Sequence, residues 1–118
     1  MDFNTKQVEG RIAEIAHLMS ELVMEYVNDT DGVDLGDIEQ GMRALMQTIG
    51  QQALAQVLTN SDQPAPDMRC ACGQKAGYRG RREGMVITVF GRVRYQRSYY
   101  VCAHCRRGEK PLDRRLGI

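Results

Sequence analysis

The stretch that decides the fold is "CACGQKAGYRGRREGMVITVFGRVRYQRSYYVCAHC", residues 70–105, which has a cysteine pair at each end. Between the pairs, 85–90 is rich in β-branched and apolar residues, and 92–101 follows after Gly91. From Val93 to Val101 every second residue is apolar, with Arg97 as the one exception. This alternation is typical of a half-buried strand. The stretch therefore predicts a β-hairpin with a basic face, with a third short strand at 76–82.

The four cysteines are placed to hold one metal ion. Cys70 and Cys72 precede the hairpin, and Cys102 and Cys105 follow it. The ends of adjacent strands would bring both pairs together, and zinc takes four such sulfur ligands in a tetrahedron. A β module of about 50 residues has little core of its own, so a metal would supply missing folding free energy. We expect one structural Zn²⁺ with no open coordination position.

Other ligand sets stay open at this point. A Cys-x-Cys pair chelates with a tighter bite than Cys-x-x-Cys, so His104 or Asp67 could replace a cysteine. A disulfide between Cys70 and Cys72 would close a strained ring, and a thioredoxin-like role for Cys102 and Cys105 would need a βαβ unit. A different metal arrangement, or no metal, remains the alternative.

The N-terminal half predicts two amphipathic helices. Apolar residues recur every three or four positions over 5–28 and again over 38–57. Thr5 could cap the first helix, and Asp34 or Asp37 the second. The turn-rich 28–37 separates them, and the prolines in 59–67 end the second helix. The apolar stripes predict core packing, either within an antiparallel helical hairpin or between two copies, and His17 is expected on the surface.

Charge divides the chain into two parts. Residues 1–68 hold three Lys or Arg against twelve Asp or Glu, and 69–118 hold thirteen against three. We therefore expect an acidic hairpin at 1–60 that could form a homodimer, a linker at 61–68 and a basic module at 69–118. No apolar run is long enough to cross a membrane and no secretory signal begins the chain, so a cytoplasmic location is the expectation.

The basic half has the composition expected for a polyanion partner. Arginine dominates it, and arginine binds phosphate in a bidentate manner. Tyr95 and Tyr99 are expected in the core by alternation, whereas Tyr78 and Tyr100 are better candidates for stacking on bases. The alternative is that the acidic half neutralises this charge, within the molecule or across a dimer. The predicted nucleic-acid-binding residues are Arg79, Arg81, Arg82, Arg92, Arg94, Arg97, Tyr100, Arg106, Arg107, Arg114 and Arg115.

The order of these residues resembles the N-terminal region of bacterial insertion-sequence transposases of the ISKra type and, more distantly, the ISLre type. In that family a cysteine pair precedes a Gly-Arg strand, a hairpin, a second cysteine pair and a Pro-Leu-Asp tail. The helical segment 37–58 also resembles the acidic helix that precedes the family's ribbon. The matching residues are Cys72, Gly73, Tyr78, Gly80, Arg81, Thr88, Gly91, Val93, Arg97, Tyr99, Tyr100, Cys102, Cys105, Pro111, Leu112, Asp113, Leu116 and Gly117.

The resemblance implies the accessory part of such a protein. The family continues beyond this region into one that carries catalytic carboxylates, and the 118 residues offer no substitute for them. The expected protein is therefore α+β, a helical hairpin followed by a small antiparallel zinc ribbon, and not an enzyme. It would bind nucleic acid, DNA in preference to RNA. The alternative is a protein-interaction subunit of a larger nucleoprotein complex that dimerises through its helices.

Overall fold

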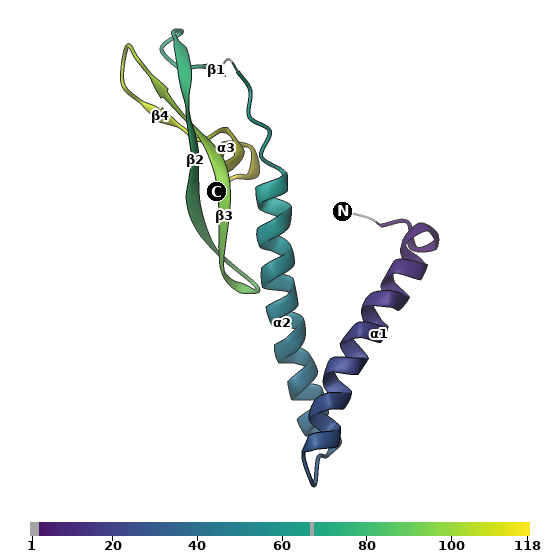
Figure 1. Ribbon diagram of the computed structural model, residues 1–118. Coiled ribbons are helices and arrows are strands. Elements are labelled where there is room, and N and C mark those ends of the chain that lie inside the picture. The colour runs from purple at the N-terminus through teal and green to yellow at the C-terminus, as the bar shows by residue number, and fades with distance from the viewer. Residues whose placement is uncertain (1–2, 67) are drawn as a thin grey trace. The chain divides into compact units, whose positions relative to one another are not determined.

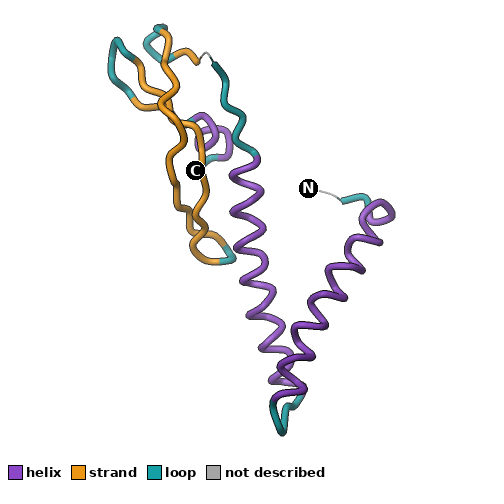
Figure 2. Tube along the Cα trace, viewed as in Figure 1, coloured by secondary structure: helices purple, strands orange, loops and turns teal. Residues whose placement is uncertain are grey.

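Two long helices precede a four-stranded antiparallel sheet in the computed structural model, which describes residues 3–66 and 68–118 (Figures 1 and 2). This confirms the α+β class and the order of its parts. The strands lie in the order β1-β2-β3-β4. The elements are α1 (Thr5–Asp29), α2 (Leu35–Asn60), β1 (Met68–Arg69), β2 (Lys75–Thr88), β3 (Gly91–Cys102), β4 (Gly108–Glu109) and α3 (Pro111–Leu116).

Contacts divide the chain into two compact units, Met1–Met46 and Gln47–Ile118. The division falls inside α2, whereas the sequence suggested modules at 1–60 and 69–118 with a linker at 61–68. The reason is that the second half of α2 packs on the sheet. Leu58 of α2 is buried with Val93 and Tyr95 of β3 and with Leu112 of α3.

Both long helices begin with side-chain caps. The side chain of Asn4 accepts a hydrogen bond from the Lys6 backbone N–H at 3.1 Å. The cap is therefore Asn4, and not Thr5 as the sequence suggested. Asp34 accepts from the Asp37 N–H at 2.8 Å, and Asp37 accepts from the Asp34 N–H at 3.2 Å. This reciprocal pair confirms the cap predicted before α2.

In the N-terminal unit the helices meet near their connecting turn. Leu22, Val23 and Tyr26 of α1 line a shallow groove with Ile38 and Leu45 of α2. No described side chain in residues 3–46 is fully buried. Along α1, Ile12, Ile15 and Leu22 were expected in a core and are exposed in the single chain, as is Leu18 beside them.

The sheet is built on one long hairpin. β2 pairs with β3 from Ala76 opposite Cys102 to Thr88 opposite Gly91. The expected strands at 76–82 and 85–90 are therefore one continuous strand. The pairing shifts by one residue between Tyr78 and Arg81, where Gly80 has φ +85°. A glycine accepts this conformation at little cost, as a β-bulge requires.

The outer edge of β3 is covered by polar side chains from α2 and the segment after it. Gln51 donates to the Arg92 carbonyl at 2.6 Å, and the Thr59 hydroxyl accepts from the Gln96 N–H at 3.0 Å. The Asp62 carboxylate accepts from the Ser98 N–H at 3.0 Å. Figure 1 shows α2 alongside β3. These bonds satisfy an edge that would otherwise be open to pairing with another strand.

Segment 61–66 is tied to the sheet in the same way. The Tyr100 hydroxyl donates a hydrogen bond to the Ala65 carbonyl at 2.6 Å and accepts one from the Ala65 N–H at 2.8 Å.

No described helix is both long and apolar enough to cross a membrane.

Candidate metal centre and the basic surface around it

The first cysteine pair lies on a tight loop between β1 and β2. The Cys70 N–H donates to the Gln74 carbonyl at 2.8 Å, and the Gly73 N–H donates to the Cys70 carbonyl at 2.9 Å. Gly73 has φ +88°, which glycine adopts readily. The glycine directly after Cys72 therefore closes the loop within one fewer residue than a Cys-x-x-Cys loop uses.

The second pair lies on a matching loop between β3 and β4. The Cys102 N–H donates to the Arg107 carbonyl at 3.0 Å, and the Arg106 N–H donates to the Cys102 carbonyl at 2.8 Å. Arg106 has φ +60° and is the one described non-glycine residue with a positive φ. Each loop is thus closed by a left-handed residue that directly follows its second cysteine.

The two loops bring all four sulfurs to one place. The Sγ atoms lie within 4.8 Å of one another. The Cys70 and Cys105 sulfurs are 3.3 Å apart, and those of Cys72 and Cys102 are 3.5 Å apart. A disulfide needs about 2.05 Å, and a tetrahedral zinc with bonds of about 2.3 Å places its sulfurs about 3.8 Å apart. The four cysteines are free, and their spacing is compatible with a metal site.

Backbone N–H groups, burial and the neighbouring thiols shift the pKa values of the cysteines. The backbone N–H of Cys105 lowers the pKa of Cys102 to about 6, and the N–H of Cys72 lowers the pKa of Cys70. The Gln74 N–H also acts to lower the pKa of Cys72, but burial and the neighbouring thiols outweigh it and raise that pKa to about 11. The pKa values of two thiols of the quartet are thus lowered, and a bound cation would favour the thiolate form of all four.

Of the two alternative ligands, His104 does not join this cluster. His104 is exposed, and among the described residues the group able to hold a metal consists of the four cysteines. Asp67 lies outside the described residues. The donor set that the structure assembles is therefore four sulfurs, from Cys70 as well as from Cys72.

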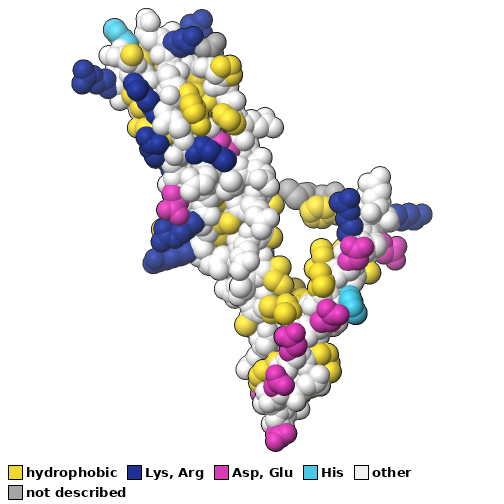
Figure 3. Space-filling model, in the orientation of Figure 1, with side chains coloured by type: hydrophobic (Ala, Val, Ile, Leu, Met, Phe, Trp, Pro, Cys, Tyr) yellow, Lys and Arg dark blue, Asp and Glu magenta, His cyan; other side chains and the backbone are white. Residues whose placement is uncertain are grey.

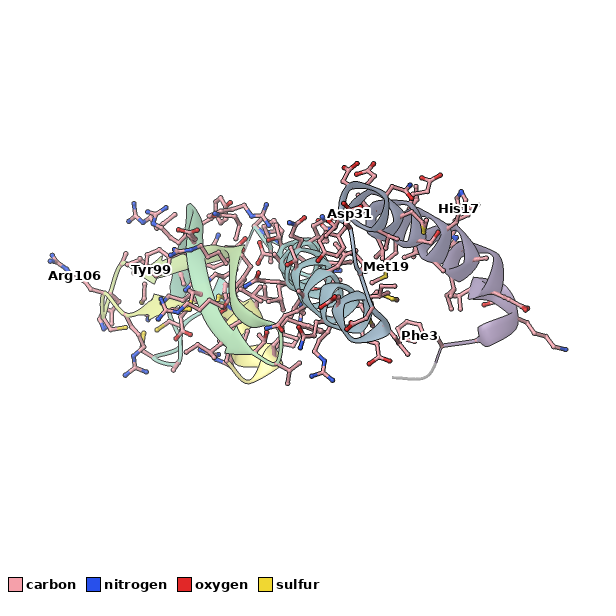
Figure 4. The ribbon with its side chains drawn as sticks, turned by 90° about the horizontal axis from the view of Figure 1, so that it is seen from below. Phe3, His17, Met19, Asp31, Tyr99 and Arg106 are labelled. Atoms are coloured by element: carbon pink, nitrogen blue, oxygen red, sulfur yellow. The ribbon has the colours of Figure 1, made fainter. Side chains whose placement is uncertain are left out.

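Most of the predicted arginines lie on the surface of the sheet unit. Figure 3 shows Lys and Arg side chains gathered over the sheet, and Figure 4 shows Arg106 extending away from it. Arg79, Arg92, Arg106 and Arg107 are exposed, and the side chain of none of them forms a hydrogen bond or ion pair with another described residue. The other exposed candidates are Arg81, Arg82, Arg94, Arg114 and Arg115.

Several of these arginines also have partners within the chain. Arg81 lies 3.5 Å from the Asp62 carboxylate, Arg94 lies 3.7 Å from that of Glu83, and Arg114 pairs with Glu109. The Arg82 guanidinium lies 5.5 Å from the centre of the Tyr99 ring, which is half-buried. These contacts orient the side chains without burying them.

Two predicted contact residues are buried, which corrects the sequence-based expectation. Tyr100 is 1% exposed, and its hydroxyl is bonded to Ala65. Arg97 is 7% exposed and lies 3.2 Å from the Asp113 carboxylate. Opposite faces of β3 are covered at its two ends, because Leu58 of α2 and Leu112 of α3 pack over Val93, while Ala65 and Met68 lie against Tyr100. A single alternating pattern therefore misplaces Tyr100.

Sequence reasoning missed the network around Asp113. The Tyr95 hydroxyl donates to one Asp113 oxygen at 2.6 Å, and Arg97 donates to the other. Arg97 also donates to the Arg82 carbonyl at 2.9 Å. Burial, with the Asp113 hydrogen bond, raises the pKa of Tyr95 to about 12. The interruption of the apolar pattern by Arg97 was the available signal, since a buried arginine requires an acidic partner.

Comparison with protein-family models, curated proteins and solved structures finds no match to this chain.

Proposed function

We propose that the protein is a non-catalytic nucleic-acid-binding protein whose sheet is a zinc ribbon. The observation that carries the proposal is that the sulfur cluster and part of the basic surface share one loop. Arg106 and Arg107 belong to the loop that holds Cys102 and Cys105, and both side chains are exposed. Metal binding and the placement of these positive charges therefore depend on one another.

Zinc is the metal that this donor set favours. Four thiolates in a tetrahedral arrangement suit zinc, and a site with four protein ligands leaves no position for water or substrate. Cys70, Cys72, Cys102 and Cys105 would each supply one bond to a single ion. The ion would supply folding free energy and hold the two loops in register, and no chemical step is assigned to it.

The partner is nucleic acid, with DNA favoured over RNA by the resemblance to transposase N-terminal regions. The exposed arginines of β2, β3 and the second cysteine loop would contact phosphates. Neutralised phosphates release counterions, so the logarithm of the affinity should fall by about 0.9 for each phosphate contact per tenfold rise in salt. By the same resemblance, the protein would serve as an accessory part of a larger nucleoprotein complex.

Salt-titrated binding to labelled single- and double-stranded DNA and RNA tests this function. Arg79→Gln with Arg92→Gln should weaken binding and reduce the salt slope by about 2. Arg43→Gln, in the acidic helical unit, is the matched control and should change neither quantity. Absence of binding to every nucleic acid at low salt would reject the proposal.

A protein-interaction role is the second candidate, and one observation favours it. Ile12, Ile15, Leu18 and Leu22 expose a large apolar face along α1. Exposed apolar stripes of this kind commonly pair with another helix. Sedimentation of the zinc-loaded protein with and without DNA tests this role. A stable dimer that DNA does not shift would favour the interaction subunit over the nucleic-acid-binding protein.

A further inference from the structure

The turn end of the β2–β3 hairpin, which lies away from the cysteine loops, has an exposed face of mixed character. Met85 and Ile87 of β2 lie directly opposite Arg94 and Arg92 of β3. Directly opposed residues of an antiparallel pair project from the same face. Met85 is 46% exposed and Ile87 is 74% exposed. Two apolar side chains and two arginines therefore share one solvent-facing surface.

The opposite face of the same strands is the one that packs into the core. Val86 and Val93, which alternate with these residues, pack with Leu58 of α2. The hairpin turn adds Val89, which is 89% exposed, while Phe90 beside it contacts Gly50 of α2. The helix thus supports one side of the hairpin and leaves the mixed face and the turn accessible.

The charge of this face identifies the kind of partner. Arg92, nearer the turn, is exposed, whereas Arg94 lies 3.7 Å from the exposed Glu83 carboxylate. The face is therefore most basic near the turn, at Arg92. Guanidinium groups beside apolar side chains match the major groove of DNA. There, phosphates line the walls, guanine offers two acceptors, and each thymine presents a methyl group at the base edge.

The dimensions favour the major groove as well. Two paired strands have axes about 4.8 Å apart before side chains are added. A major groove about 12 Å wide admits a two-stranded ribbon, whereas a minor groove about 6 Å wide would have to open. A lipid surface fits less well, because two or three apolar side chains give weak membrane binding.

We infer that the turn end of the β2–β3 hairpin inserts into the major groove of double-stranded DNA, with Met85 and Ile87 contacting thymine methyl groups beside Arg94 and Arg92. This inference rests on the proposed function, and it adds the form of the nucleic acid, the groove and the contacting residues. In this arrangement the apolar side chains contribute to DNA affinity in addition to the phosphate contacts of the arginines.

Replacing thymine by uracil in a duplex removes the methyl groups and leaves every phosphate in place. The zinc-loaded full chain should bind an alternating adenine–thymine duplex more tightly than the matched adenine–uracil duplex, by about fourfold for each methyl contact. The salt slopes of the two duplexes should be equal, because the phosphate contacts are the same.

Ile87→Ser should reduce the difference between the duplexes while the protein still binds both. Ile87 is exposed, so the variant should fold, and circular dichroism checks that it does. Val57→Ser is the matched control, since Val57 is 56% exposed on α2 in the same unit and should keep the full difference.

Equal binding of both duplexes by the unmodified chain would overturn the inference while leaving the proposed function intact. Displacement by a minor-groove-binding drug would overturn it in the same way. Failure to bind any duplex while single strands or RNA are still bound would overturn the inference alone, whereas absence of binding to every nucleic acid at low salt would remove both. Binding to anionic vesicles, or self-association, that is lost in Ile87→Ser would assign the face to lipid or to a second copy instead.

Discussion

The sulfurs of Cys72 and Cys102 lie 3.5 Å apart although 30 residues separate them in the chain. They approach because Ala76 pairs with Cys102 at the end of the β2–β3 hairpin, next to the loop that carries Cys72. The same pairing places Cys70 beside Cys105, at 3.3 Å. The hairpin thus delivers the two loops to one site, and a metal would hold them there.

Removing one sulfur should unfold the sheet unit. Structural zinc contributes on the order of 10 kcal/mol to small metal-dependent modules, which is comparable to the whole stability of an ordinary domain. We expect Cys72→Ser, or a strong chelator, to abolish the dispersed amide NMR signals of 68–118. Ala71→Ser changes the exposed neighbour and should leave them unchanged. A well-dispersed spectrum after chelation would show that the sheet does not need the ion.

Asp113→Asn should destabilise the protein by about 3 kcal/mol. The substitution leaves the Arg97 guanidinium buried without its carboxylate, and breaking a buried pair costs about 3–5 kcal/mol. Urea denaturation of the zinc-loaded protein measures the change. Glu83→Gln removes the partner of Arg94 in an exposed pair and should cost less than about 1 kcal/mol. Equal effects of the two substitutions would mean that the Arg97 pair is not structural.

Alkaline pH should weaken the fold through Tyr95. Its pKa is raised to about 12 in the folded chain, against an ordinary value of 10. The neutral hydroxyl therefore contributes stability that is fully present below pH 10 and is lost as the pH rises towards 12. Unfolding free energies measured between pH 9 and 12 should fall less steeply in Tyr95→Phe. Parallel curves would show that Tyr95 is not the titrating group.

Arg106→Gly should keep or raise stability and weaken nucleic-acid binding. Arg106 has φ +60°, a conformation that costs an ordinary residue roughly 1–2 kcal/mol and glycine little. Arg107→Gly removes the same charge beside it without relieving a positive φ, so it should lower stability. Thermal unfolding and binding of both variants separate strain from charge. If Arg106→Gly destabilised as much as Arg107→Gly, strain at Arg106 would be ruled out.

The hairpin and the sulfur cluster could be predicted because local patterns carry them. Alternation marks β3, and the cysteine spacing marks the loops at its ends. The burial of Tyr100 could not be predicted, because it depends on Ala65, which is 35 residues away and follows a proline-containing segment. The bulge at Gly80 could not be predicted either, since Gly-Arg sequences occur in regular strands and in turns alike.

The packing of α2 was predicted only in part. Its apolar spacing identified the helix, but periodicity does not reveal what covers a helix, and Leu58 packs against β3 and α3. Gln51 and Thr59 gave no signal at all, because polar residues at a helix surface are ordinary. Their role follows from the open edge of β3, which exists only once the sheet has formed.

The central claim is that a metal at the four cysteines holds the basic surface in its binding form. Titration of zinc into metal-free protein, followed by the fluorescence anisotropy of a labelled DNA duplex, tests this claim most directly. Binding should appear in proportion to added zinc and reach its maximum at one equivalent per chain. Full binding by the metal-free protein, or none at any zinc concentration, would contradict the account.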